Sequence, residues 1–197
     1  MRILALAVAM LVGSGVANAA VQTKVVEYKE GETTLDGYLA WDDAVQGRRP
    51  GVLVVHEWTG LGDYAQTRAR MLAEMGYVAF AADIYGKGIR PKTPREAATQ
   101  AGIYKKDRQL MRARTLVGLE ILRRDPMCDP KRVAAIGYCF GGTCVLELAR
   151  SGADLAGVVS FHGGLDTPTP ADAKNISVLP VSVQNLFRGW SAAVGGW

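Results

Sequence analysis

The segment Gly137-Tyr138-Cys139-Phe140-Gly141-Gly142 constrains the fold of this chain more than any other feature of its sequence. An apolar run at 133–136 precedes it, and residues 143–150 after it have the apolar spacing of a helix. A strand, a G-x-C-x-G turn and a helix in this order predict a sharp turn that exposes the central side chain, here Cys139. The amide of the next residue, Phe140, is then free to donate to an oxyanion. The alternative is a small buried side chain at a tight junction, because unpaired cysteines are often buried.

Strand and helix patterns alternate along most of the chain. Four short apolar runs have the signature of strands buried on both faces, and they lie at 52–55, 77–82, 133–136 and 158–161. Helical spacing appears between them, at 64–75, after the capping box Thr93-Pro94-Arg95-Glu96 with a break near Gly102, and at 108–124. Two further strands at 24–30 and 35–41 flank Gly31-Glu32 and predict a hairpin. The alternation predicts an α/β fold with a mostly parallel sheet and flanking helices.

The first 19 residues have the pattern of a signal peptide. Arg2 is a short basic region, Ile3 to Val12 are apolar, and Ala17-Asn18-Ala19 fits a cleavage site. The apolar stretch is too short to span a bilayer. We therefore expect a periplasmic or secreted protein that begins at Ala20 and has no stable membrane anchor after cleavage.

Three cysteines occur in this chain, an odd number for an exported protein. Cys128 and Cys144 flank the strand–turn–helix segment, and the sequence leaves open whether they form a disulfide or stay unpaired. The net charge of +4 is modest and the basic residues are dispersed, so nothing indicates a nucleic-acid surface.

Polar segments directly follow each of the four buried strands. They are His56-Glu57-Trp58-Thr59-Gly60-Leu61, Asp83-Ile84-Tyr85-Gly86, the Cys139 segment and Phe161-His162-Gly163-Gly164. In this combination the chain resembles the dienelactone hydrolase family of the α/β-hydrolase fold, over roughly Val25 to Asn175. The resemblance implies a hydrolase of small carboxylic esters or lactones that needs no cofactor and no metal.

The resemblance also implies a role for individual residues. Cys139 matches the nucleophile, and Glu57 matches the glutamate that holds the resting cysteine and takes its proton. The amides of Phe140 and Trp58 match the oxyanion hole. His162 and Tyr85 are possible residues of the site's rim. His56 precedes the nucleophile, and the chain order of this fold, nucleophile then acid then histidine, excludes it from a triad.

The C-terminal part departs from the family pattern. The family places an acid and a histidine beyond Asn175, but from Ile176 to Trp197 there is no Asp, Glu or His. We therefore interpret 20–175 as the α/β-hydrolase domain and 176–197 as an aberrant or truncated tail, with the final strands missing or aberrant. This predicts little esterase activity and an uncovered sheet edge near Val158–Phe161 that lowers solubility.

Three functions compete at this stage. The first is the ester or lactone hydrolase. The second is a catalytically dead, truncated fold that at most binds ligand, which the absence of an acid and a histidine favours. The third is a different cysteine-elbow domain, of a glutaminase or redox type, which Glu57 and the Asp83 segment disfavour. Trapping an acyl-enzyme separates the first from the second, and trapping a sulfenate at Cys139 tests the third.

Overall fold

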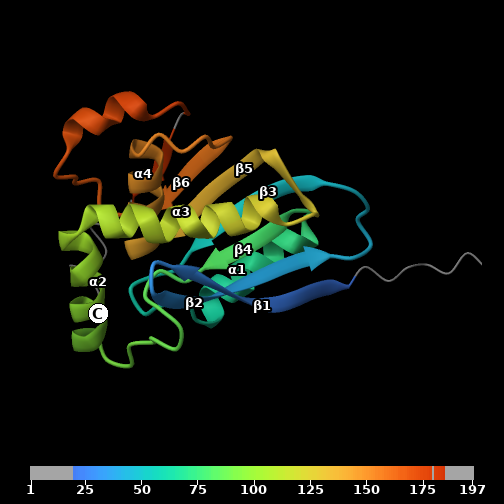
Figure 1. Cartoon of the computed structure of the whole chain (residues 1–197), viewed down its shortest axis with the longest axis horizontal. Helices are drawn as coiled ribbons and strands as arrows, with labels where there is room; N and C mark the ends of the chain where they lie inside the picture. Colours follow the sequence, from blue (N-terminus) through green and yellow to red (C-terminus); the bar gives the residue numbers. More distant parts are fainter. Residues whose placement is uncertain (1–19, 179, 185–197) are drawn as a thin grey trace, which may run out of the picture.

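Seven strands form one mixed sheet with helices on both faces in the computed structural model, which describes residues 20–178 and 180–184 (Figure 1). The elements are β1 (Val21–Glu30), β2 (Thr33–Asp42), β3 (Arg49–Val55), α1 (Asp63–Glu74), β4 (Val78–Ala82), α2 (Pro94–Lys106), α3 (Arg108–Arg124), β5 (Cys128–Tyr138), α4 (Phe140–Arg150), β6 (Gly157–Phe161) and β7 (Pro180–Val183), with a 3-10 turn at Pro170–Asn175. The strand order is β1-β2-β4-β3-β5-β6-β7. Strands β1, β2 and β4 pair antiparallel, and β4, β3, β5, β6 and β7 pair parallel. This confirms the predicted mostly parallel α/β sheet.

The first two strands form the predicted hairpin. Their residues pair without interruption from Val21 opposite Asp42 to Glu30 opposite Thr33. Gly31 takes a φ of 54°, a left-handed conformation that glycine adopts without steric cost. The hairpin joins the rest of the sheet through the antiparallel pairing of β2 with β4.

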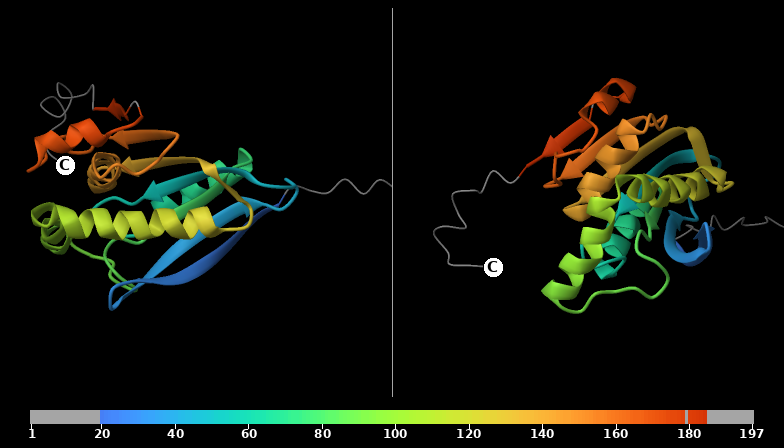
Figure 2. Two further views of the ribbon diagram at one scale, coloured as in Figure 1. Left: turned by 45° about the horizontal axis from the view of Figure 1, so that its top comes forward. Right: turned by 60° about the vertical axis from the view of Figure 1, so that its left-hand side comes forward.

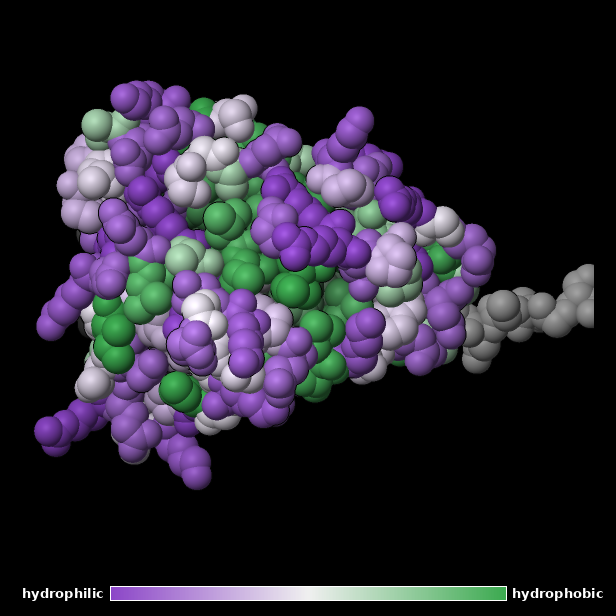
Figure 3. Space-filling model, viewed as in Figure 1, coloured by the Kyte–Doolittle hydropathy of each residue, from purple (hydrophilic) through white to green (hydrophobic). Residues whose placement is uncertain are grey.

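The segments Val52–Val55 of β3 and Val78–Ala82 of β4 are apolar because helices cover both faces of the sheet there. Side chains alternate along a strand, so Val52 and Val54 of β3 pack in one cluster with three buried alanines of α1, while Leu53 and Val55 pack in another with residues of α3 and α4. Figure 1 shows α3 and α4 on the near side of the sheet and α1 behind it. The outer surface on the α3 side is mostly hydrophilic, with apolar residues showing near its middle (Figure 3).

Helix α2 begins as predicted but ends elsewhere. Thr93 Oγ1 accepts from the Glu96 amide at 3.2 Å, and Glu96 Oε2 accepts from the Lys92 amide at 2.9 Å. The predicted break near Gly102 is wrong, since the helix continues to Lys106. The break lies at Asp107, whose carboxylate accepts from the Leu110 amide at 2.9 Å and caps α3. A side-chain cap therefore ends one helix and starts the next, whereas a single glycine does not interrupt α2.

An ion-pair network connects the 3-10 turn at Pro170–Asn175 to α3 and α4. Glu147 of α4 is fully buried and pairs with Arg112 at 2.7 Å and with Arg150 at 2.8 Å. Arg112 also contacts Asp172 of the 3-10 turn at 2.7 Å. Arg112 and Arg150 together compensate the buried charge of Glu147. Replacing either arginine alone would leave one carboxylate oxygen of Glu147 without its ion-pair partner.

Strand β7 corrects one expectation about the C-terminal part. It pairs parallel with β6, from Val158 opposite Pro180 to Phe161 opposite Val183. Within the described residues β6 is therefore not an edge strand, contrary to the prediction. Pro180 stands first in β7, a position where a missing N–H is tolerated. Figure 2 shows β7 at the rim of the molecule beside β6.

Residues that the sequence analysis assigned to the tail contribute to the fold. Ile176 and Val178 pack against the main hydrophobic cluster. The boundary at residue 175 and the aberrant character of the tail stay predictions, because residues 185–197 lie outside the described part of the chain. The predicted signal peptide, residues 1–19, also lies outside it. In the part that the structure describes, no helix is long and apolar enough to cross a membrane.

Candidate active site at the carboxyl edge of the sheet

Cys139 occupies a strained turn between β5 and α4. Its φ is 53° and its ψ is −112°, an uncommon conformation for a residue with a Cβ atom. Both flanking glycines are required by close contacts. A Cβ on Gly137 would lie 2.0 Å from Gly141 O, and one on Gly141 would lie 2.3 Å from Val55 O. The thiol side chain is half-buried. The turn therefore has the predicted geometry, with Cys139 directly before the first turn of α4.

The sheet register brings the segments that carry Glu57 and Cys139 to the same edge of the sheet. Strands β3 and β5 are parallel neighbours, and Val55 pairs with Gly137. Glu57 and Cys139 each follow their paired residue by two positions. The carboxylate of Glu57 also contributes to raising the pKa of Tyr138, the residue before Cys139, although burial is the larger cause. Both observations support a shared site for Glu57 and Cys139, and their chemical roles stay predictions.

The hydrogen bonds around the turn leave the Phe140 amide available. The Cys139 amide is already used, because it donates to Phe161 O at 2.9 Å. The first amides of a helix have no partner within the helix, and its dipole favours negative charge there. Phe140 N–H is the first amide of α4. Its position fits the predicted role of an oxyanion donor.

Tyr85 fixes the peptide group of Trp58. The Tyr85 hydroxyl donates to Trp58 O at 2.9 Å. Burial raises the pKa of Tyr85 well above its usual range, and smaller contributions come from Cys144, Tyr104 and Cys139. Tyr85 therefore lies close to both Trp58 and Cys139. The interpretation of Tyr85 as a rim residue is wrong, since its side chain is 2 % exposed and packs edge-on against His56 and tilted against Phe140.

His56 is a buried neutral link between two loops. Its Nε2 accepts from the Ile84 amide at 3.2 Å, so the proton resides on Nδ1, which donates to Glu57 O at 2.5 Å. Burial lowers the pKa of His56 to about 4, against a smaller opposing effect of the Glu57 carbonyl. The imidazole thereby joins the loop after β3 to the loop after β4. The exclusion of His56 from a triad stays a prediction, and sequence reasoning did not identify the link that His56 makes between the two loops.

His162 lies on the surface at the end of β6. Its side chain is exposed, its φ is 46°, and its amide donates to Val183 O at 2.7 Å. The backbone of the preceding residue, Phe161, accepts from Cys139 N. His162 therefore neighbours the turn, in agreement with a rim position, and its part in the chemistry stays a prediction.

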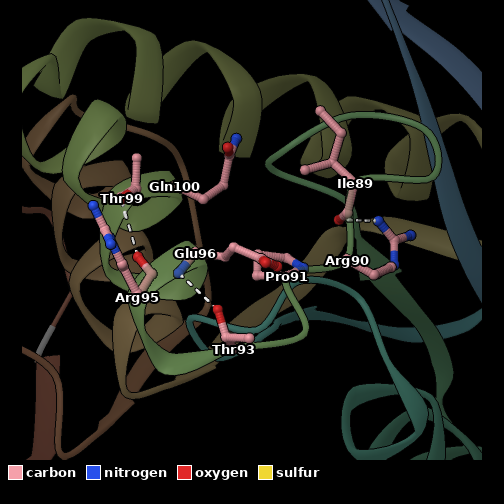
Figure 4. Close-up of a pocket in the computed structure, with 8 residues that line it drawn as sticks. All are labelled: Ile89, Arg90, Pro91, Thr93, Arg95, Glu96, Thr99 and Gln100. Carbon is pink, nitrogen blue, oxygen red and sulfur yellow. Dashed lines mark hydrogen bonds between the residues drawn. The ribbon is translucent and has the colours of Figure 1, made fainter.

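The basic loop between β4 and α2 borders a depression of about 570 Å³ (Figure 4). The Arg90 guanidinium already has partners within the protein. It donates to Gly86 O and Ile89 O and lies 3.6 Å from the buried carboxylate of Asp83. Arg95 and Glu96 line the same depression with Thr99 and Gln100 of α2. The two charges oppose each other, so the depression does not select strongly for an anion.

The other two thiols are buried and unpaired. Cys128 is 1 % exposed and Cys144 is fully buried. Burial raises the pKa of Cys128 to about 11 and raises that of Cys144 further. Of the two possibilities left open by the sequence, the structure has the unpaired cysteines. Within residues 20–178 and 180–184, no group of three His, Cys, Asp or Glu side chains is arranged to hold a metal ion.

Comparison with known proteins agrees with this geometry. A model of the dienelactone hydrolase family matches residues 35–184. This chain belongs to the dienelactone hydrolase family. Its fold superimposes on that of m3DLH with a TM-score of 0.81 at 41% identity, covering 84% of this chain and 69% of that one. A dienelactone hydrolase-like promiscuous phosphotriesterase from metagenomic libraries has a TM-score of 0.80 at 39% identity, with the same coverages.

A curated relative carries an enzyme name. The carboxymethylenebutenolidase of Pseudomonas sp. (strain P51) is 32% identical over 115 residues, which cover 54% of this chain and 47% of the relative. The family and its named members are hydrolases. The chain spans about two thirds of the length of the two solved structures, 69% in each case.

Proposed function

We propose that this chain attacks small carboxylic esters or lactones with the Cys139 thiol. The observation that carries the proposal is the position of Cys139, in a strained turn at the N-terminus of α4. Cys139 follows β5 at the sheet edge where Glu57 follows the neighbouring parallel strand β3. Side chains at the carboxyl edge of a parallel sheet face the crevice where this class of fold binds its ligands.

The acylation step uses four groups of this edge. The Glu57 carboxylate takes the thiol proton, and the Cys139 thiolate forms a bond to the carbonyl carbon of the substrate. The amides of Phe140 and Trp58 stabilise the oxyanion that develops. As the tetrahedral intermediate collapses, the carbon–oxygen bond to the alcohol breaks, Glu57 returns its proton to the leaving oxygen, and a thioester remains on Cys139.

Hydrolysis of the thioester needs a base for the attacking water. Glu57 and His162 are the candidate bases, because each follows a strand that neighbours β5. We propose that acylation is faster than deacylation in this chain, because a complete acid–histidine pair normally supplies the second step. The expected kinetic signature is a burst of product followed by slow turnover.

Release of p-nitrophenol from p-nitrophenyl acetate tests the proposal. We expect a burst close to one equivalent of protein, followed by a slower steady rate. Cys139→Ala should abolish the burst, and Glu57→Gln should slow it by about a hundredfold, the usual effect of losing a general base. Glu32→Gln, in the exposed β1–β2 turn, is the matched control and should change neither phase.

Two outcomes would point to another function. Binding of ester without any Cys139-dependent release would indicate a fold that only binds ligand. Rapid formation of a sulfenate at Cys139 under mild peroxide, without a burst, would favour the redox function. His162→Ala would separate a role of His162 in deacylation, since it should slow the steady rate and leave the burst unchanged.

We further propose that the protein is exported and acts in the periplasm or outside the cell. The basic, apolar and A-x-A segments within residues 1–19 support this. Fractionation of the source cells followed by N-terminal sequencing tests it. We expect a chain that begins at Ala20, and an intact Met1 on a cytoplasmic protein would contradict the proposal.

A further inference from the structure

The loop that carries the Trp58 amide lies against the loop that follows β4. We call residues 56–61 the β3 loop and residues 83–90 the β4 loop. At one end the Tyr85 hydroxyl joins them, because it donates to Trp58 O at 2.9 Å. At the other end they are joined by Arg90, the last residue of the β4 loop. The position of the β3 loop therefore depends on more than Tyr85.

The Arg90 guanidinium contacts both loops. Its Nε donates to Leu61 O, the last carbonyl of the β3 loop. Within the β4 loop its Nη1 donates to Gly86 O at 3.3 Å and to Ile89 O at 2.8 Å, and Figure 4 shows the second of these bonds. A guanidinium is planar and holds its donors in a rigid fork. The three bonds therefore fix Leu61 O relative to the β4 loop.

Gly60 lets the two backbones approach closely at the same end. Its φ is 86°, and a Cβ atom there would lie 2.9 Å from Ile89 O and 3.2 Å from Arg90 Cδ. Packing at Gly60 stops the loops from moving closer, and the bond to Leu61 O stops them from separating. The Gly60 amide also donates to Glu57 O at 3.3 Å. Because of this turn, Glu57 follows any displacement of the β3 loop at this end.

The buried carboxylate of Asp83 compensates the charge of Arg90. Asp83 is fully buried, and its Oδ1 lies 3.6 Å from Arg90 Nη1. The same oxygen accepts from the amides of Tyr85 at 3.1 Å and Gly86 at 3.2 Å. Since the charge of Arg90 is already compensated within the protein, its contacts favour a role in holding the loops over a role in binding an anionic substrate.

We propose that Arg90 is a positioning residue for the acylation of Cys139. It holds the β3 loop at Leu61 and thereby keeps the Trp58 amide and the Glu57 carboxylate in place while the thiol reacts. The effect on acylation rests on the proposed function, and Arg90 itself touches no substrate. Misplacing a reacting group by about 1 Å can cost about a hundredfold in rate. Loss of the bond that holds this loop should therefore be measurable in the burst.

The p-nitrophenol burst of Arg90→Met tests the proposal. We expect its maximal rate to fall by about ten- to a hundredfold, while the ester concentration for half-maximal rate changes by less than about twofold. Arg95→Met is the matched control, because it removes the same group from an exposed position beside the same depression. It should change neither quantity. A maximal burst rate in Arg90→Met equal to that of the parent would overturn the proposal.

An ester with a free carboxylate separates positioning from substrate binding. Mono-p-nitrophenyl succinate carries a carboxylate that p-nitrophenyl acetate lacks. If Arg90 positions the β3 loop, Arg90→Met slows the reaction of both esters by the same factor. A loss confined to the succinate, with a higher half-maximal concentration, would assign Arg90 to the substrate and overturn the proposal.

Arg90→Lys separates the hydrogen bonds from the charge. Lysine keeps the positive charge opposite Asp83 but lacks the guanidinium fork, so this variant should also be slowed about tenfold. A parent-like burst in Arg90→Lys would show that the charge alone matters and would overturn the proposal. The same variant provides both the burst and the exchange measurement described next should Arg90→Met unfold.

Hydrogen–deuterium exchange decides the positioning independently of activity. The amides of the β3 loop should exchange about tenfold faster in Arg90→Met than in the parent or in Arg95→Met. Peptides from β5 should be unchanged, which reports an intact fold. Faster exchange of the β3 loop in a protein whose parent shows no burst would refute the proposed function and keep Arg90 as the residue that holds the loop. Unchanged exchange of the β3 loop in Arg90→Met would refute the positioning itself.

Discussion

Adding one methyl group at Gly141 should break the contact between the turn and the end of β3. A Cβ at this position would lie 2.3 Å from Val55 O, 2.6 Å from His56 O and 2.7 Å from Val55 C. Ordinary contacts are about a full ångström longer, and the opposing atoms are all backbone, so the α4 N-terminus and the end of β3 must separate. Overpacking of this kind costs about 3 kcal/mol, and the higher helix propensity of alanine returns up to about 1 kcal/mol.

We therefore expect Gly141→Ala to lower the free energy of unfolding by about 2 kcal/mol, and the Tm by roughly 4–8 °C for a chain of this size. Gly102→Ala is the matched control, because Gly102 lies in α2 with nothing within 4 Å of the added Cβ. It should raise the stability by up to about 1 kcal/mol. Urea unfolding followed by circular dichroism measures both variants.

The same displacement moves Glu57 relative to Cys139, so Gly141→Ala should also reduce the burst of p-nitrophenol by more than the loss of folded protein explains. A Gly141→Ala variant as stable as the parent, with an unchanged burst, would refute the close packing of the turn against β3 on which the site rests.

Three further predictions concern single side chains. Because burial holds the pKa of His56 at about 4 against 6.5 when unfolded, the stability present above pH 6.5 should decline as the pH falls toward 4, by about 2 kcal/mol between pH 7 and pH 5. Urea unfolding at these two pH values should show the decline in the parent and in His162→Gln but not in His56→Gln, and a decline retained in His56→Gln would assign it to other groups. Tyr85→Phe removes the hydrogen bond to Trp58 O and should slow acylation by about tenfold. Tyr28→Phe loses two buried hydrogen bonds with the Asp83 backbone and should instead lower the stability by about 2 kcal/mol; equal acylation rates in the two variants would exclude the positioning role of Tyr85. Limiting iodoacetamide at pH 8 should alkylate Cys139 first, because a thiol with a pKa of about 11, such as Cys128, is only about one-thousandth ionised at that pH. Preferential labelling of Cys128 or Cys144 in peptide maps would contradict the inference that Cys139 is the most accessible of the three thiols.

Local patterns identified the elements of this chain because their causes are local. The glycines of the Cys139 turn, the cap at Thr93 and the continuous apolar runs each report a requirement that neighbouring residues impose. The break expected at Gly102 was wrong for a related reason. A glycine only weakens a helix, and the side-chain cap at Asp107, five residues later, determines where α2 ends.

Contacts between distant segments could not be predicted in the same way. Tyr85 is hydrogen-bonded to Trp58, 27 positions away, and Ile84 to His56, 28 positions away. No local sequence pattern in either segment predicts these partners. The prediction that Glu57 and Cys139 share a site came from the family resemblance, and the register of β3 with β5 supports it. Strand β7 was not predicted, because residues 176–197 were interpreted as an aberrant tail. Its Pro180 is compatible with a strand, since the first position does not need the missing N–H.

The most direct test of the central claim is the identity of the acylated residue. The protein is mixed with p-nitrophenyl acetate, quenched in acid during the burst, and analysed by intact mass and peptide mapping. We predict one acetyl group per chain, on the peptide that contains Cys139, absent in Cys139→Ala and formed more slowly in Glu57→Gln. Release of p-nitrophenol with no acetyl group on Cys139, or with the acetyl group on another residue, would contradict the account.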